Sequence, residues 1–135
     1  MTRSELAKMI DHTVLRADAA QGDVATLCDE AVHHGFAAVS INPAWVSFCA
    51  QKLEGAGVLV NATIGFPLGA NTAAVKVAET RDAVKNGATE LDMVINVGAL
   101  KSGYADFVEK EIAAVVKAAE GVPIKVILET SLLNT

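Results

Sequence analysis

The chain alternates short apolar runs with longer amphipathic segments, and glycines mark four of the boundaries between them. Gly35, Gly57, Gly87 and Gly121 each follow a segment of helical pattern and precede an apolar run. Glycine just beyond a helix end adopts the left-handed backbone that commonly terminates helices. The apolar runs are short and rich in valine and isoleucine, as buried parallel strands are. The predicted strands are Ile10–Thr13, Phe36–Ile41, Val58–Ile64, Ala88–Val97 and Ile124–Glu129.

The segments between these runs have the periodicity of amphipathic helices. Asn42 and Pro43 suit the N-cap and first position of one helix. Thr2 and Glu5 can form a capping box in a short leading helix. The alternation predicts a single α/β domain over residues 1–135 with a parallel sheet. The predicted inward-facing residues are Val24, Leu27, Cys28, Ala31 and Val32; Val75, Ala78, Ala83 and Val84; and Phe107, Ile112, Val115 and Val116.

Polar residues share one face within each predicted strand, which bears on the choice between two architectures. The alternation alone fits both an open doubly wound sheet and a closed (β/α)8 barrel. An open sheet between helices favours apolar residues on both faces, whereas a barrel interior admits polar side chains near its active-site end. The pattern therefore favours the TIM-barrel class. The same-face pairs are Asp11 and Thr13, Ser40 and Asn42, Asn61 and Thr63, Asp92 and Asn96, and Lys125 and Glu129.

The length of the chain limits how much of such a barrel it can form. A complete barrel takes roughly 250 residues, whereas this chain has 135 and reaches only its fifth predicted strand. We therefore expect a partial barrel of about five βα units. Three interpretations follow: a truncated fragment, a chain that pairs with another copy, or an open sheet with exposed edges.

Composition and charge disfavour several classes of protein. With 52% hydrophobic and 20% charged residues, the chain can bury a substantial core. A net charge of −5 without a cluster of basic residues disfavours nucleic-acid binding, and no apolar run reaches the ~20 residues that span a bilayer. The N-terminus lacks the apolar core of a signal peptide, and Cys28 and Cys49 fit reduced core thiols. We therefore expect a cytoplasmic location.

Asp92 is the first candidate functional residue, because it lies within the apolar run Glu90–Val97. Charged side chains are rare in such segments unless they are paired, hydrogen-bonded or used in chemistry. Strand alternation places Asp92 and Asn96 on one face and Leu91 on the other. A structural carboxylate paired with Lys125 is the alternative interpretation.

Five sequence blocks lie at or just after the carboxyl ends of the predicted strands, in the order of the strands. Parallel barrels build their active sites at the carboxyl ends of their strands. The blocks are Ile10–Thr13, Ser40–Pro43, Thr63–Thr72, Glu90–Asn96 and Lys125–Thr130. Gly-Phe-Pro-Leu-Gly-Ala-Asn followed by Leu-Asp-Met-Val-Ile-Asn is far more specific than a lone glycine motif. Together the blocks resemble the N-terminal part of the deoxyribose-phosphate aldolase family over the whole chain.

This resemblance implies a class I aldolase on a TIM barrel. The family reversibly cleaves 2-deoxy-D-ribose 5-phosphate into D-glyceraldehyde 3-phosphate and acetaldehyde through a lysine Schiff base, without a metal or cofactor. Its proton-relay aspartate maps to Asp92, and the lysine that begins its fifth strand maps to Lys125. Its Schiff-base lysine and phosphate-binding loops would follow Thr135, so we expect no Schiff-base lysine within this chain. The other candidates for the substrate pocket or its support are Asp11, Thr13, Ser40 (cysteine in many relatives) and Asn42.

The lysines can also be judged by their chemistry. An amine that forms an imine must be neutral, and therefore desolvated or close to another cation. Only Lys125 is expected to be buried, and Asp92 on the neighbouring strand would keep it charged. We therefore expect Lys125 to be an ion-pair partner and this polypeptide alone to have little or no aldolase activity. The lysines expected in solvent are Lys8, Lys52, Lys76, Lys85, Lys101, Lys110 and Lys117.

Other interpretations remain open at this point. A non-catalytic subunit or fragment would associate through exposed sheet edges as a homo-oligomer, and another phosphate-handling barrel enzyme would share this pattern. Asp11 and Thr13 could brace the barrel mouth, and His12 fits a partnered core or interface histidine.

The remaining motifs limit which ligands we expect. No set of His, Cys, Asp and Glu has metal-ligand spacing. The segment Gly65–Asn71 lacks the ending of a phosphate loop, so we expect it to shape the rim of the site. The predicted partner is a small phosphorylated sugar or aldehyde, with neither nucleic acid nor a membrane involved.

Overall fold

The computed structural model describes residues 1–134 and shows a five-stranded parallel sheet in the order β1-β2-β3-β4-β5. The strands are β1 (Asp11–Val14), β2 (Ala38–Ile41), β3 (Leu59–Ile64), β4 (Glu90–Val94) and β5 (Ile124–Ile127). The longer helices between strands are α2 (Gln21–His34), α3 (Val46–Lys52), α4 (Ala73–Lys85) and α6 (Ala105–Ala118). The short elements are α1 (Arg3–Ala7), η1 (Pro43–Trp45), α5 (Val97–Lys101) and η2 (Thr130–Leu132). The predicted alternation of strands and helices is confirmed.

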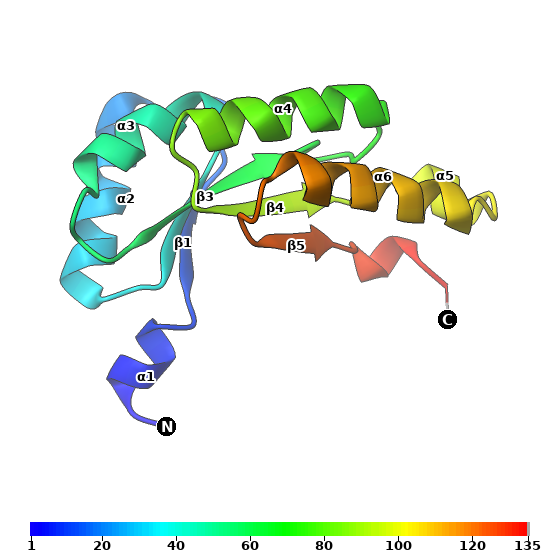
Figure 1. Ribbon diagram of the computed structural model, residues 1–135. Coiled ribbons are helices and arrows are strands. Elements are labelled where there is room, and N and C mark those ends of the chain that lie inside the picture. Colours follow the sequence, from blue (N-terminus) through cyan, green and yellow to red (C-terminus); the bar gives the residue numbers. More distant parts are fainter. Residues whose placement is uncertain (135) are drawn as a thin grey trace.

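The longer helices lie on one side of the sheet, and within residues 1–134 none of them covers the other, open side. Figure 1 shows α4 and α6 side by side above β3, β4 and β5, while α1 projects away from the sheet. Lys125 on β5 contacts Asp11 on β1, although β2, β3 and β4 lie between these strands. The sheet must therefore curl toward its open side. An open doubly wound sheet would carry helices on both sides, so this architecture matches a partial barrel.

The hydrophobic core lies between the outer face of the sheet and the helices. Leu91 and Met93 of β4 are fully buried, and Ile95 is 6% exposed. Their strand neighbour Asp92 faces the open side, as the alternation along a strand requires. The core therefore occupies one face of the sheet and leaves the polar face for a site. The other fully buried core residues include Val24, Cys28, Ala31, Val39, Ile41, Val46, Cys49, Ala62, Ile64, Ala83 and Val115.

Local signals at the helix ends are partly as predicted. The backbone φ angles of Gly35, Gly57, Gly87 and Gly121 are all positive, between 66° and 110°. Gly35 is the C-cap of α2 and Gly87 follows the C-cap of α4, whereas α3 already ends at Leu53, before Gly57, and Glu120 separates Gly121 from the end of α6. Thr2 and Glu5 form the predicted capping box of α1. None of the helices within residues 1–134 is long and apolar enough to cross a membrane.

Two strands end earlier than predicted, because the residues after them serve the next element. Asn96 lies beyond β4, and its side chain accepts a hydrogen bond from the Ala99 amide at 3.0 Å as the N-cap of α5. Glu129 lies beyond β5 with φ 51° and precedes η2. Neither residue extends the polar face of its strand.

The predicted inward faces of the helices are partly wrong. Lys76 of α4, expected in solvent, is fully buried, and Glu111 of α6 is buried with it. A hydrophobicity pattern judges the burial of each residue separately. It therefore misses Lys76 and Glu111, which are buried together as an ion pair. The predicted inward residues that are instead exposed are Val32, Val75, Ala78, Phe107 and Val116.

Candidate active site

Asp92 lies in a row of polar side chains on the open face, near the carboxyl ends of the strands. In the parallel register, Thr63 of β3 pairs with Asp92 of β4, and Asp92 pairs with Lys125 of β5. Lys125 Nζ lies 3.4 Å from Asp92 Oδ1. The structure thus brings together the two residues that the sequence singled out.

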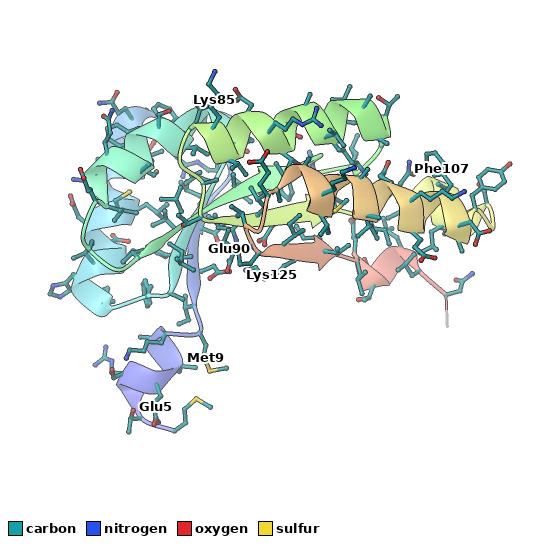
Figure 2. All side chains as sticks on the ribbon, viewed as in Figure 1. Glu5, Met9, Lys85, Glu90, Phe107 and Lys125 are labelled. Carbon is teal, nitrogen blue, oxygen red and sulfur yellow. The ribbon has the colours of Figure 1, made fainter. Side chains whose placement is uncertain are left out.

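Lys125 is the centre of a cluster with three carboxylates. Its Nζ donates a hydrogen bond to Asp11 Oδ2 and lies 2.7 Å from Glu90 Oε1, in addition to its contact with Asp92. Figure 2 shows Glu90 and Lys125 together on the side of the sheet away from α4 and α6. Burial disfavours the charged form, but the hydrogen bonds to Asp11 and Glu90 and the charge of Asp92 outweigh it and raise the pKa of Lys125. Lys125 is therefore a cation.

Lys125 was expected to be buried, and this expectation is wrong. Its side chain is 49% exposed. Within residues 1–134, β5 is an edge strand, and the open face beside it is not covered. The strand pattern identifies the face on which Lys125 lies but cannot indicate whether another part of a protein covers that face.

The raised pKa of Lys125 leads to a prediction about alkaline stability. The folded chain keeps Lys125 charged to a higher pH than the unfolded chain, whose lysines have a pKa of about 10.4. The stability from this group is therefore fully present below that value and lost as pH rises through the folded-state pKa. Lys125→Met should lower the free energy of unfolding in urea at neutral pH, by a small amount because solvent screens the cluster. The difference from wild type should shrink above about pH 10.4; a difference that persists unchanged there would contradict the prediction.

A second polar row lies one layer closer to the amino ends of the strands. Thr13 pairs in register with Ser40, Ser40 with Asn61, and Asn61 with Glu90. Asn61 Nδ2 donates to Glu90 Oε1 at 3.0 Å, which holds the carboxylate toward Lys125. Ser40 is buried in this row, whereas Thr13 is exposed and donates its hydroxyl to the Asp11 carbonyl.

Asn42 does not reach the charged cluster. It lies at the N-cap of η1 without a capping bond from its side chain, and its amide donates to the Leu15 carbonyl at 3.3 Å. Asn42 therefore links the segments that follow β1 and β2. Of the residues proposed to support the pocket, Asp11 joins Lys125, while Thr13 and Asn42 bond to backbone.

Three buried polar atoms on this face of the sheet lack a hydrogen-bond partner among the described residues. Asn61 Oδ1, Thr63 Oγ1 and Asp92 Oδ1 form no hydrogen bond with any described residue. Asp92 Oδ1 is the oxygen that lies 3.4 Å from Lys125 Nζ, within ion-pair distance. Asn61 is 0% and Thr63 2% exposed. Buried polar atoms are normally hydrogen-bonded, so this face is equipped to bind a polar group. Asn61, Thr63 and Glu90 were not among the candidate residues, although their strand parity placed them on this face.

The loop Gly65–Gly69 follows β3 and packs against the end of β4. The Gly65 amide donates to Glu79 Oε2 of α4 at 2.7 Å, and the Gly69 amide donates to the Gly65 carbonyl at 2.7 Å. A Cβ on Gly69 would lie 2.2 Å from the Ile95 carbonyl oxygen. The loop thus packs directly against the backbone that follows β4.

A strained backbone costs about 1–3 kcal/mol. Gly69→Ala should lower the free energy of unfolding by more than this. Gly69 has φ +64°, and alanine would add the clash with Ile95 to this strain. Gly35→Ala is the matched control, because Gly35 has φ +66° and open space where a Cβ would lie. Urea denaturation of both variants separates the two effects, and equal losses would show that the approach to Ile95 is unimportant.

His12 of β1, Cys28 of α2 and Cys49 of α3 lie away from the polar face of the sheet and contact other side chains. His12 Nε2 lies 2.6 Å from Glu30 Oε2, and its ring lies 5.1 Å from that of Phe36. Cys28 and Cys49 are buried free thiols with their sulfur atoms 3.7 Å apart. In the described part of the chain, no group of His, Cys, Asp and Glu is placed to hold a metal ion.

Similarity to known proteins extends over almost the entire chain. The DeoC/LacD family aldolase model matches residues 6–135. A deoxyribose-phosphate aldolase from Geobacillus sp. (strain WCH70) is 54% identical over 132 residues, which cover 97% of this chain and 59% of that protein. A deoxyribose-phosphate aldolase from Brevibacillus brevis is 57% identical over 127 residues, which cover 94% of this chain and 58% of that protein. The chain thus spans less than two thirds of the length of these relatives.

Solved structures share the same fold. A candidate deoxyribose-phosphate aldolase from Coccidioides immitis superposes with a TM-score of 0.96 at 41% identity, over 99% of this chain and 53% of that chain. The deoxyribose phosphate aldolase of Aeropyrum pernix, described as a tetramer, gives a TM-score of 0.89 at 36% identity over 98% and 56%. The five-stranded sheet is therefore part of a TIM-barrel fold, and the chain belongs to the DeoC/LacD aldolase family.

Proposed function

We propose that this chain provides the proton-handling part of an active site that reversibly cleaves 2-deoxy-D-ribose 5-phosphate into D-glyceraldehyde 3-phosphate and acetaldehyde. The observation that carries the proposal is Asp92, which lies beside the charged Lys125 with a buried oxygen left free of hydrogen bonds from described residues. The names of the relatives support the substrate and the reaction class.

The proposed reaction passes through a lysine Schiff base, and it needs a group that moves protons. When the carbon–carbon bond breaks, a substrate hydroxyl loses a proton and the carbon that becomes the acetaldehyde methyl group gains one. A positioned carboxylate can do both as a general base and acid, and Asp92 takes this role. Asp11 and Glu90 hold Lys125 beside it, and Asn61 and Thr63 offer hydrogen bonds to bound substrate or water.

We further propose that none of the lysines in this sequence is the nucleophile. A lysine amine is neutral near pH 7 only where it is desolvated or close to another cation, and a neighbouring anion keeps it charged. Lys76 pairs with Glu111, and Lys125 pairs with its carboxylates. The lysines that are exposed to solvent on helices or adjoining turns are Lys8, Lys52, Lys85, Lys101, Lys110 and Lys117.

Borohydride reduction in the presence of acetaldehyde should therefore trap no stoichiometric adduct on this polypeptide. Intact-mass spectrometry and peptide mapping provide the measurement, with the urea-unfolded chain as the control for random modification of lysines. A single lysine labelled to completion in the folded chain, but not in the unfolded chain, would overturn this part of the proposal.

A chimera tests the function itself. This chain would replace the aligned 59% of the Geobacillus sp. deoxyribose-phosphate aldolase, which is covered at 54% identity. We expect the chimera to release acetaldehyde from 2-deoxy-D-ribose 5-phosphate, with the unaltered Geobacillus protein as the reference. A folded chimera without this activity would contradict the proposal.

The open edges favour a second proposal, that the chain forms homo-oligomers. Strands β1 and β5 are the edges of the sheet, and Leu128 and Leu132 after β5 are each 46% exposed. Strand edges with unpaired backbone groups are ready sites for association. Light scattering after size exclusion should show a mass above that of one chain, and a uniform monomer would rule this out.

A further inference from the structure

We propose that Lys76, buried beneath the loop Gly65–Gly69, is a positioning residue for Asp92; the catalytic meaning of this role rests on the function proposed above. Lys76 lies in the first turn of α4, and its side chain is 0% exposed. Its Nζ donates to the Val94 carbonyl at 3.0 Å and to Glu111 Oε1 at 2.5 Å. Val94 is the last residue of β4 and follows Asp92 by two positions.

Lys76 lies where three parts of the structure meet. Its stem packs under the loop after β3, because a Cβ on Gly65 would lie 2.9 Å from Lys76 Cε. Its ammonium group contacts the end of β4 and α6. One turn further along α4, Glu79 accepts the Gly65 amide at 2.7 Å. The lysine therefore joins the loop, the strand that carries Asp92 and two helices.

A stabilising role alone does not account for a lysine at this position. Its burial is costly, and the first turn of a helix disfavours positive charge. A buried ion pair is often no more stable than apolar residues of similar volume. An apolar residue could not donate to the Val94 carbonyl, however, and this bond fixes the path of the chain as β4 ends. Glu111, whose Oε2 has no partner among the described residues, compensates the charge of Lys76.

Amide hydrogen exchange at the two ends of β4 tests this role in the chain itself. At the carboxyl end the Ile95 amide donates to the Ile127 carbonyl at 3.1 Å, and at the amino end the Leu91 amide donates to the Pro123 carbonyl at 2.9 Å. In Lys76→Met, exchange of Ile95 should rise at least about tenfold more than that of Leu91. The side-chain carboxyl ¹³C resonance of Asp92 should also move. An equal rise at both amides, or an unchanged Asp92 resonance, would reduce Lys76 to a stabilising residue and overturn the proposal.

Two further variants keep the test decisive. Lys52→Met removes a lysine on α3 whose ion pair, at 2.8 Å, is with Asp29 Oδ1 of α2 and not with β4 or α6, so the ratio of exchange rates should stay at the wild-type value. Lys76→Met with Glu111→Leu removes both buried charges and so protects folding, yet the ratio should remain raised because Val94 still lacks its donor. A wild-type ratio in this double variant would overturn the proposal. Exchange requires no catalysis, so an inactive chimera and a failed positioning role remain distinguishable.

Discussion

Asp92→Asn in the chimera is expected to slow the cleavage of 2-deoxy-D-ribose 5-phosphate by about 10²–10⁴-fold, the usual contribution of a general acid–base. Asparagine keeps the shape of the side chain but cannot accept and return a proton. Asp92 lies beside Lys125, and its Oδ1 accepts no hydrogen bond from a described residue, so the carboxylate keeps an unused acceptor for a proton. Because the proton moves only in the transition state, kcat should fall while KM changes little.

Glu90→Gln is the matched control, since it makes the same chemical change on the same strand. Glu90 contacts Lys125 at 2.7 Å and accepts a hydrogen bond from Asn61, so its role is to hold Lys125. We expect a smaller loss of kcat than for Asp92→Asn. Equal losses would assign the effect to the position of Lys125, and a wild-type kcat in Asp92→Asn would exclude Asp92 as the proton relay.

The variant Lys76→Met is expected to lower the free energy of unfolding by about 3–5 kcal/mol, because it leaves the buried Glu111 without a counter-charge. Both side chains are at most 1% exposed, so solvent cannot replace the lost partner. For domains whose whole stability is about 5–15 kcal/mol, this is a large fraction. Urea denaturation followed by circular dichroism measures the loss.

The double variant Lys76→Met with Glu111→Leu should recover most of that loss, since apolar residues often replace a buried ion pair at little cost. Lys52→Met, which removes a pair with Asp29 that is partly exposed to solvent, should cost no more than about 1 kcal/mol. A double variant as unstable as the single one would show that the loss does not come from an orphaned charge. If the double variant regains its free energy of unfolding while the Ile95 amide still exchanges faster, the stabilising effect of Lys76 is distinct from its role in positioning the end of β4.

Signals read along a few neighbouring residues predict the architecture well. The glycines after the helices, the capping box at Thr2 and the valine-rich runs depend on backbone conformation and local packing, so they act in the same way in any fold. Strand parity also places Asp92, Lys125 and Asp11 on one face before their contacts are known. The ends of β4 and β5 are less predictable, because Asn96 and Glu129 serve the elements that follow.

The sequence by itself determines a parallel α/β sheet with one apolar face and one polar face, because the alternation of side chains along a strand is local. Only the tertiary structure decides which charges meet. The curl of the sheet brings Asp11 to Lys125 across 114 positions of the chain, and the packing of α4 against α6 buries Lys76 with Glu111. Whether a charged side chain is buried here depends on a partner distant in sequence. The hydrophobicity pattern of the helix does not include that partner, and it therefore predicted Lys76 to be in solvent.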